Sequence, residues 1–167
     1  MVTESHGEND YADQIGRRWE ELHPGSNSAA LVASIRLERV GKRHDAGLDG
    51  ALLPFAHRGV RNVEDFRLLA MLRRTAAPVS ATEVSREMQI TKAATSTRVE
   101  RLVDAGLVER ESAQYDRRSS PLVLTSRGTT LTDECLDAII AARQMTFANL
   151  SESEVATFAD LLKKAEE

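Results

Sequence analysis

One short segment in the middle of the chain constrains the fold most strongly, because it contains two helix start signals separated by very few residues. Ser80 and Glu83 form a capping box, in which each side chain accepts a hydrogen bond from the other residue's backbone N–H. The helix that follows has room for about two turns before a tight turn at residues 89–90. Thr91 is a good N-cap for another helix, which we expect to end at Gly106 in the left-handed conformation. Two short helices joined by so tight a turn predict a helix-turn-helix.

A small β wing is predicted to follow this pair of helices. Residues 107–110 and 122–124 have the composition of two strands, and the polar residues 111–120 between them form a loop. Before the pair, residues 63–74 carry apolar side chains on nearly all sides, which is typical of a buried helix. These elements together predict a winged helix-turn-helix.

Two helices are predicted ahead of the winged segment. The first carries an apolar stripe with helical spacing, made of Tyr11, Ile15, Trp19 and Leu22. The second is expected to run from about Ser28 to Asp45, and the glycine-rich residues 47–62 then form a connection.

Two more helices are predicted after the wing. The long one starts near Ser126 and carries a stripe of Leu131, Cys135, Leu136, Ile139, Ala142 and Met145. A second capping box, Ser151 with Glu154, opens the last helix, whose apolar face holds Val155, Phe158, Leu161 and Leu162. Because these faces lie far from the winged core along the chain, each needs a partner, and we expect that partner to be a second copy of the chain.

The net charge of −4 hides a segregation of charge along the chain. Residues 58–128 hold 13 Lys and Arg against 9 Asp and Glu, a net of +4, whereas the two flanks together hold 9 against 17, a net of −8. A basic centre between acidic ends suits a DNA-contacting module on an acidic scaffold. Aromatic residues make up only 4%, which argues against a stacking platform for single-stranded nucleic acid.

The helix predicted after Thr91 separates into two faces. Its inner face holds Thr95, Val99, Leu102 and Val103, and its outer face holds Ala93, Thr97 and Arg101, with Ser96 at the edge and Lys92 in the first turn. Small and hydroxylated residues let a helix enter a major groove, where hydroxyls bond base edges. We expect Arg98 and Arg101 to reach phosphates. The other interpretation is an ordinary solvated helix surface, but the capping box, the tight turn and the wing favour double-stranded DNA.

The wing loop adds three candidate DNA contacts, Asp116, Arg117 and Arg118. The carboxylate of Asp116 can accept from the Arg118 guanidinium and hold it extended. An arginine ordered in this way loses less entropy on entering a narrow, A·T-rich minor groove. The alternative is an incidental ion pair on a solvated turn.

The fold class that follows is mainly α with a small β wing, a winged helix-turn-helix with long N- and C-terminal dimerisation helices. Residues 1–9 are interpreted as a disordered tail and residues 10–47 as the N-terminal extension and dimerisation helices. Residues 48–125 are interpreted as the DNA-binding domain, and residues 126–167 as the C-terminal dimerisation helices.

Catalytic, metal and membrane functions have no support in the sequence. No Ser-His-Asp arrangement or phosphate-binding glycine pattern is present, so we expect neither an enzyme nor a cofactor. The four histidines are scattered, and a lone cysteine, Cys135, excludes an internal disulfide and a cysteine-rich zinc site. Because Cys135 lies on an apolar stripe, we expect it to be a packing residue and not an oxidant sensor. No apolar run approaches the roughly 20 residues needed to cross a bilayer, and the acidic first residues are unlike a signal peptide, so we expect a cytoplasmic, nucleoid-associated protein.

A family resemblance lies in three motifs of the winged segment. They are the run TRVERLVDAGLVER at residues 97–110, the tripeptide DRR at 116–118, and Leu124-Thr125 followed by Gly128. On these motifs the chain resembles the MarR family of dimeric bacterial transcription regulators over about residues 28–166. The resemblance implies a triangular homodimer built from the terminal helices, in which two winged domains read a palindrome. It also implies a small-molecule or redox signal that loosens DNA binding.

The N-terminal extension resembles one branch of that family. Trp19, followed by Pro24, looks like part of the extended first helix of the urate-responsive branch, and the resemblance implies Trp19, Arg74 and Arg98 as ligand contacts. That branch has an Asp early in the buried helix, where we align Arg67, and we expect Arg67 to contact the ligand as well. We therefore expect a small anionic aromatic effector, with a carboxylate or phenolate preferred over urate. A packing role for Trp19, anchoring the extra helix to the domain, is the other interpretation.

Two functions stay open at this point. One is a ligand-responsive regulator, in our interpretation a repressor, that binds a pseudo-palindromic operator as a homodimer. The other is a winged-helix dimer without DNA binding that acts as a protein-interaction or anti-regulator module. The basic recognition face and the Asp-x-Arg pattern of the wing favour the first.

Overall fold

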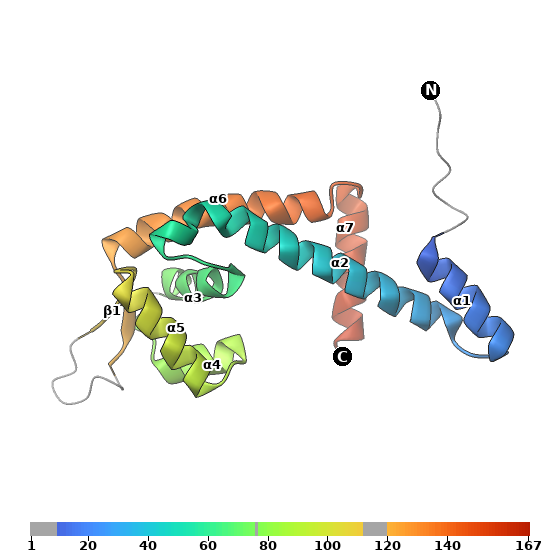
Figure 1. The fold of residues 1–167 in the computed structure, drawn as a ribbon, viewed down its shortest axis with the longest axis horizontal. Coiled ribbons are helices and arrows are strands. Elements are labelled where there is room, and N and C mark those ends of the chain that lie inside the picture. Colours follow the sequence, from blue (N-terminus) through green and yellow to red (C-terminus); the bar gives the residue numbers. More distant parts are fainter. Residues whose placement is uncertain (1–9, 76, 112–119) are drawn as a thin grey trace, which may run out of the picture. The chain divides into compact units, whose positions relative to one another are not determined.

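The computed structural model describes residues 10–75, 77–111 and 120–167 (Figure 1). Its elements are α1 (Tyr11–Leu22), α2 (Ser28–Leu52), the 3-10 helix η1 (Leu53–Arg58), α3 (Val63–Arg74), α4 (Ala81–Met88), α5 (Lys92–Asp104), β1 (Val108–Arg110), β2 (Leu122–Leu124), α6 (Ser126–Thr146) and α7 (Glu152–Ala165). The chain divides into two compact units, one up to His44 and one from Asp45 onward. The fold class predicted from the sequence, mainly helical with a small β wing, is confirmed.

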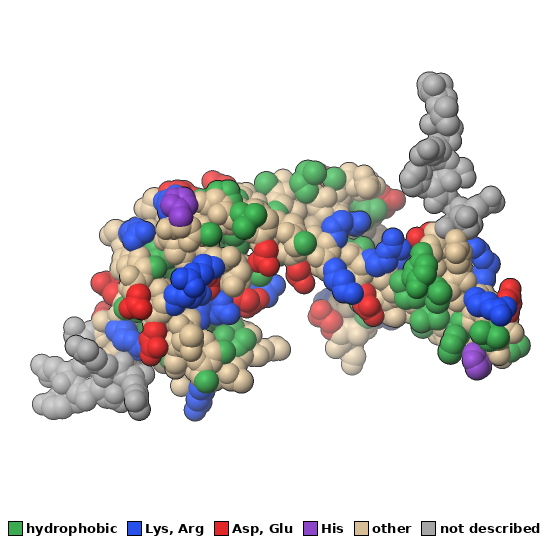
Figure 2. Space-filling view, in the orientation of Figure 1, with side chains coloured by type: hydrophobic (Ala, Val, Ile, Leu, Met, Phe, Trp, Pro, Cys, Tyr) green, Lys and Arg blue, Asp and Glu red, His purple; other side chains and the backbone are tan. Residues whose placement is uncertain are grey.

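The first unit contains α1 and the first part of α2. Gly16 is buried, and a side chain at this position would collide with Val32 of α2. The apolar stripe of α1 is not the surface that packs here, because Trp19 is 46% exposed and Figure 2 shows hydrophobic side chains gathered over α1. The sequence therefore predicted the helix correctly, but α1 packs on α2 through its small residues.

The second unit is built around α3, which is buried on nearly all sides as its composition predicts. The core cluster contains apolar side chains from the end of α2, from α3, α4 and α5, from the two strands and from α6. Its largest completely buried members include Leu48, Leu52, Leu68, Leu69, Leu102, Leu107, Leu122, Leu131 and Ile139. Burial of these side chains is the main source of stability for the unit.

The helix-turn-helix forms as its local signals predict. The Ser80 hydroxyl accepts from the Glu83 backbone N–H at 3.2 Å, and the Glu83 carboxylate accepts from the Ser80 backbone N–H at 2.8 Å. Gln89 ends α4 in the left-handed conformation, with φ of 54°. The Thr91 side chain caps α5, and Gly106, with φ of 67°, follows the end of that helix.

The base of the wing is also present. β1 and β2 pair antiparallel, with Val108 opposite Leu124, and Val79 adds an isolated bridge to Leu122. The predicted contacts at the wing tip, Asp116, Arg117 and Arg118, lie outside the described residues.

The end of α2 corrects one prediction. We expected the helix to stop near Asp45 and residues 47–62 to form an irregular connection, but α2 continues to Leu52 and η1 follows at once. Leu48 and Leu52 are 1% and 0% exposed. Burying two leucines outweighs the helix penalty of Gly47 and Gly50, about 1 kcal/mol each.

The C-terminal helices start where the sequence predicts. Leu131, Cys135 and Ile139 of α6 are buried in the core, whereas the neighbouring Leu136 is 41% exposed. Within the described chain, α7 buries no residue, although Phe158 contacts Phe147. In the part of the chain that the structure describes, no helix is both long and apolar enough to span a membrane.

Candidate nucleic-acid interface and adjoining pocket

The outer face of α5 carries four of the predicted contact residues on the surface. Lys92, Ala93, Ser96 and Thr97 are exposed in the N-terminal half of the helix. The Thr97 hydroxyl donates to the Ala93 carbonyl at 3.1 Å, which leaves its oxygen free to accept from a base edge. The acidic Glu100 is exposed farther along the helix. A carboxylate repels phosphates, so the N-terminal half of α5 is the part of this face that suits a contact with DNA.

The inner face of α5 fixes the helix to the rest of the domain. Val99 and Leu102 are completely buried, as the helical pattern predicts. A buried hydrogen bond of 2.7 Å joins the hydroxyl of Thr95 to that of Ser85 in α4. The two helices of the helix-turn-helix are therefore held together by apolar packing and by a hydrogen bond that is shielded from water.

The structure places Arg98 and Arg101 differently from the expected phosphate contacts. Arg98 donates to the Asp65 carboxylate of α3 at 2.7 Å, and Arg101 forms a second ion pair with the same carboxylate. The side chain of Asp65 is 0% exposed, and those of Arg98 and Arg101 are 19% and 24% exposed. Both guanidinium groups therefore have a buried partner within the domain and tie α5 to α3.

Asp65 is a functional candidate that the sequence analysis missed. Its second carboxylate oxygen accepts from the Arg61 backbone N–H at 2.9 Å, and Asn62, the N-cap of α3, accepts from both Asp65 and Arg98. An acidic residue therefore does lie early in α3, two positions before Arg67. The local signal was the N-cap asparagine with an acidic residue three positions later, but nothing local indicates which cations the carboxylate meets.

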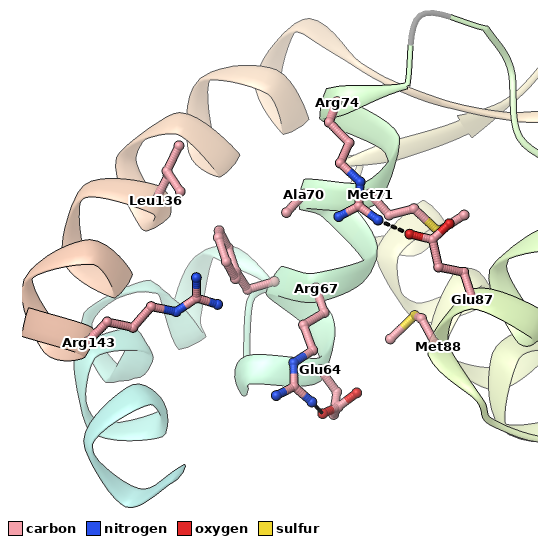
Figure 3. Close-up of a pocket in the computed structure, with 10 residues that line it drawn as sticks. Glu64, Arg67, Ala70, Met71, Arg74, Glu87, Met88, Leu136 and Arg143 are labelled. Carbon is pink, nitrogen blue, oxygen red and sulfur yellow. Dashed lines mark hydrogen bonds and ion pairs between the residues drawn. The ribbon is translucent and has the colours of Figure 1, made fainter. Parts of the chain in front are cut away.

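A pocket of about 410 Å³ lies between α3, α4 and α6 (Figure 3). It brings together Arg67 and Arg74, as expected, and adds Arg143 from α6. The apolar part of its wall is formed by Phe66, Ala70, Met71, Met88 and Leu136. A pocket with this combination of arginines and apolar side chains fits a small planar anion.

Two of the three pocket arginines already have carboxylate partners. Arg67 pairs with Glu64, and Arg74 pairs with Glu87 of α4, as the dashed lines in Figure 3 show. Within residues 10–75, 77–111 and 120–167, no carboxylate pairs with Arg143, and Figure 3 shows its side chain extending from α6 toward α3. A ligand anion would therefore meet Arg143 without having to displace a described carboxylate.

The other two predicted ligand contacts are not among the residues that line this pocket. Arg98 is engaged with Asp65, and Trp19 belongs to the first compact unit, where its ring lies 4.5 Å from that of His23 between centroids. Arg143 was not predicted from the sequence, because this residue lies beside the apolar stripe of α6, in a position that looks like ordinary solvated surface.

Cys135 has the environment of a packing residue. It is completely buried, and burial raises the pKa of its thiol to about 11, which leaves almost no thiolate at neutral pH. Among the described residues, no group of three or more His, Cys, Asp or Glu is arranged to hold a metal ion.

Comparison with known proteins decides the family. Residues 61–119 match the model of the MarR family. The chain is 30% identical over 128 residues to the HTH-type transcriptional repressor Rv2887 of Mycobacterium tuberculosis, covering 77% of this chain and 88% of that protein. The chain belongs to the MarR family. It is therefore a winged-helix, DNA-binding transcriptional regulator and not an enzyme.

Other relatives of this MarR-family regulator extend the likeness along the chain. It is 25% identical over 154 residues to the HTH-type transcriptional regulator PecS of Dickeya dadantii, covering 91% of this chain and 90% of that protein. Its structure is similar to that of E. coli MarR C80S complexed with operator DNA, with a TM-score of 0.68, 26% identity, and coverage of 88% of this chain and 96% of that one. It is also similar to Rv2887 in complex with salicylic acid, with a TM-score of 0.60, 29% identity, and coverage of 77% and 92%.

Proposed function

We propose that this regulator is a repressor that binds a pseudo-palindromic operator as a homodimer and leaves it when a small anionic aromatic ligand binds. The observation that carries the proposal is the exposed, small and hydroxylated N-terminal face of α5, held by buried contacts on its other side. The similar E. coli MarR C80S structure is a complex with operator DNA, which supports operator binding by this chain.

The proposed base contacts are Ala93, Ser96 and Thr97, with Lys92 at a phosphate. The proposed minor-groove contacts are Arg117 and Arg118, with Asp116 orienting the second arginine. We assign Arg98 and Arg101 to holding α5 in place through Asp65. Two-fold symmetry then requires half-sites about one helical turn apart.

The homodimer is proposed because the terminal helices are uncovered in the single chain. Leu161 of α7 is 60% exposed, and Ile140 of α6 is 44% exposed. Apolar residues so repeatedly exposed along helices mark an interaction surface. Light scattering at micromolar concentration tests this proposal, and a stable, folded monomer would contradict it.

The proposed effector site is the pocket between α3, α4 and α6. Arg143 would take the carboxylate, because it has no described carboxylate partner, and Phe66 with Met88 and Leu136 would cover the ring. Rv2887, which is similar in structure, has been solved with salicylic acid, and this supports an aromatic acid as the ligand class.

The ligand would act on the helix-turn-helix through α4. Arg74 pairs with the carboxylate of Glu87 in α4, on the other side of the pocket. An anionic ligand near Arg74 would compete with Glu87 for this arginine and so loosen the contact of α3 with α4. The ligand lowers DNA affinity only if it binds the non-operator conformation more tightly than the operator-bound one.

The DNA-binding proposal is tested by gel shift with the DNA upstream of the protein's own gene. We expect Arg118→Ala to weaken binding by about 1–3 kcal/mol, most on sites with A·T-rich flanks, and Thr97→Ala to change base preference within the half-site. Ser153→Ala, at an exposed position of α7, is the matched control and leaves DNA binding unchanged. If Arg118→Ala bound every sequence as tightly as the wild type, the wing assignment would be wrong. A protein that shifted no DNA would instead be the interaction or anti-regulator module.

The effector proposal is tested by titrating the protein–DNA complex with salicylate, with urate and with a neutral aromatic alcohol. We expect salicylate to release DNA and Arg143→Gln to weaken that release at least tenfold, since a charge-assisted contact to the carboxylate is lost. Arg67→Asp and Trp19→Phe test the contacts expected from the sequence. Arg73→Gln is the control, because Arg73 pairs with Asp133 and does not line the pocket. Release that is indifferent to both Arg143 and Arg67 would rule out this pocket.

A further inference from the structure

The side chain of Arg127 joins the first turn of α6 to the C-terminal end of α5. The Arg127 guanidinium donates to the Ala105 carbonyl, at the end of α5, at 2.6 Å. It also donates to the Arg58 carbonyl, at the end of η1, at 3.2 Å. Figure 1 shows this meeting point of α5 and α6 beside β1.

Contacts of the neighbouring Thr125 and Gly128 reinforce this joint. The Thr125 hydroxyl donates to the Gly106 carbonyl at 2.8 Å, and the Thr125 backbone N–H donates to the Leu107 carbonyl at 3.1 Å. Any side chain at Gly128 would collide with the Leu107 backbone. The start of α6 is thus fitted closely to the segment that leaves α5.

The guanidinium of Arg127 suits this place for a general physical reason. The last carbonyls of a helix lack partners within the helix and carry a partial negative charge, so a cation there is favourable. Because a guanidinium presents several donors in a rigid plane, it can serve two carbonyls of different helices together. Since η1 directly continues α2, Arg127 connects α6 and the end of α2 to α5.

We infer that Arg127 is a positioning residue that sets the angle of α5 relative to α6, and thereby the operator spacing that the regulator accepts. The inference rests on the proposed function, in which α6 belongs to the dimer interface and two α5 helices read one operator. In such a dimer, the orientation of α5 on α6 fixes the distance and rotation between the two α5 helices.

Other ion pairs also fasten α6 to the winged core, but they do not reach α5. Arg58 pairs with Glu134, and Arg73 pairs with Asp133 at 2.9 Å. These contacts hold α6 to η1 and to α3. Arg73→Ala is therefore a matched control, because this substitution removes an exposed arginine contact to α6 and leaves the end of α5 unchanged.

The test measures affinity against operator spacing. A duplex selected by the wild type from a randomised pool is remade with one base pair removed, or with one or two inserted, between the half-sites. Each added pair shifts a half-site by about 3.4 Å and rotates it by roughly 34°. We expect the wild type and Arg73→Ala to lose at least about tenfold in affinity at the wrong spacing.

For Arg127→Ala we expect a flatter profile, with affinities within about threefold across the spacings and reduced affinity at the best one. Arg127→Lys keeps the charge, but its single ammonium cannot span both carbonyls as the guanidinium fork does, so its profile is expected to lie between the two. Melting temperatures are measured beside the affinities, and Arg127→Lys carries the test if Arg127→Ala does not fold.

Two results would overturn the inference. In one, the Arg127 variants lose the same factor at every spacing, which marks a purely structural contact. In the other, their spacing profile equals that of the wild type. A wild type that itself ignores spacing would instead refute the proposed palindromic operator, and the inference with it.

Discussion

The winged core and the terminal helices α1 and α7 have the same kind of amphipathic sequence pattern, but their apolar faces differ in burial. In the core, the apolar residues of α3 are covered by the chain itself, and Leu68 and Leu69 are completely buried. In α7 no residue is buried, and on α1 the aromatic stripe stays on the surface. The difference shows that a helical apolar stripe predicts an amphipathic helix, but does not say whether the rest of the chain covers its apolar face.

The ion pairs of the two units differ in the same way. Asp65 in the winged core is withdrawn from water and shared by two arginines. Asp10 in the first unit also meets two arginines, Arg36 at 3.3 Å and Arg39 at 3.0 Å, and the hydrogen bond from Arg39 lowers the pKa of this carboxyl. All three of these groups remain in contact with solvent, so water and salt compete for them.

The largest effect is expected at Asp65. Asp65→Ala leaves the Arg98 and Arg101 charges without their buried carboxylate, and we expect a loss of about 3–5 kcal/mol in the free energy of unfolding. Asp10→Ala is the control from the other unit and should leave unfolding of the winged core unchanged. Urea denaturation followed by circular dichroism measures both variants. Equal losses would show that the two ion-pair clusters do not differ as their burial indicates.

The next effect concerns the uncovered helices. Leu161→Glu places a charge on the exposed apolar face of α7, and we expect the dimer dissociation constant to rise by about 100-fold or more, because the charge would be buried against the partner. The helical content of the separated chains should change little, since α7 contributes nothing to the core. Analytical ultracentrifugation across a concentration series measures the change. An unchanged dissociation constant would mean that this face of α7 is not covered by a second copy.

Cys135 tests whether the covered side of α6 is closed to solvent. Its raised pKa, about 11 against an ordinary 9.0, leaves about 100-fold less thiolate near pH 8, so we expect alkylation of the folded protein to be slower by at least that factor than in urea. Because the folded thiol holds its proton more tightly than the unfolded one, stability should fall as the pH rises from about 9 to 11. Rates of iodoacetamide labelling provide the measurement. Fast labelling of the folded protein would show that the core opens at α6.

The smallest effect is expected when the N-cap serine is removed from either of two capping boxes that have the same residue types. Ser80→Ala, at the start of α4 in the core, should lower the free energy of global unfolding by about 1 kcal/mol. Ser151→Ala, at the start of α7, should instead increase local fraying, detected by amide hydrogen exchange. Hydrogen bonds from Ser80 and Ser151 lower the pKa of Glu83 and of Glu154, respectively. Both boxes should therefore be intact above pH 4.5 and weaken as the pH falls below it. Fraying that is equal at both helices would contradict the difference between core and terminal helix.

Much of the fold was predictable because its signals are local. The caps of α4, α5 and α7 involve residues three positions apart, and each forms as expected. The end of α2 was not predictable in this way. Gly47 and Gly50 are real stop signals, but Leu48 and Leu52 find buried places in the core, and this burial decides the outcome.

The site was predictable only in part, for a related reason. Helical periodicity correctly places Lys92, Ala93, Ser96 and Thr97 on the exposed face of α5, but it also places Arg101 there, which the structure contradicts. The roles of Arg98 and Arg101 depend on Asp65, which lies far away in the sequence, and no pattern in α5 indicates that carboxylate. The pocket likewise requires α6 to bring Arg143 to α3 and α4.

The sequence by itself determined the α-helices apart from the end of α2, the wing strands, the tight turn and the family, because each rests on residues that interact over a few positions or on a contiguous motif. Only the tertiary structure decided which of the charged residues face solvent and which face one another. The reason is that a side chain's electrostatic partner is set by chain segments that meet in space, and a carboxylate such as Asp65 changes role completely when burial removes water as its alternative partner.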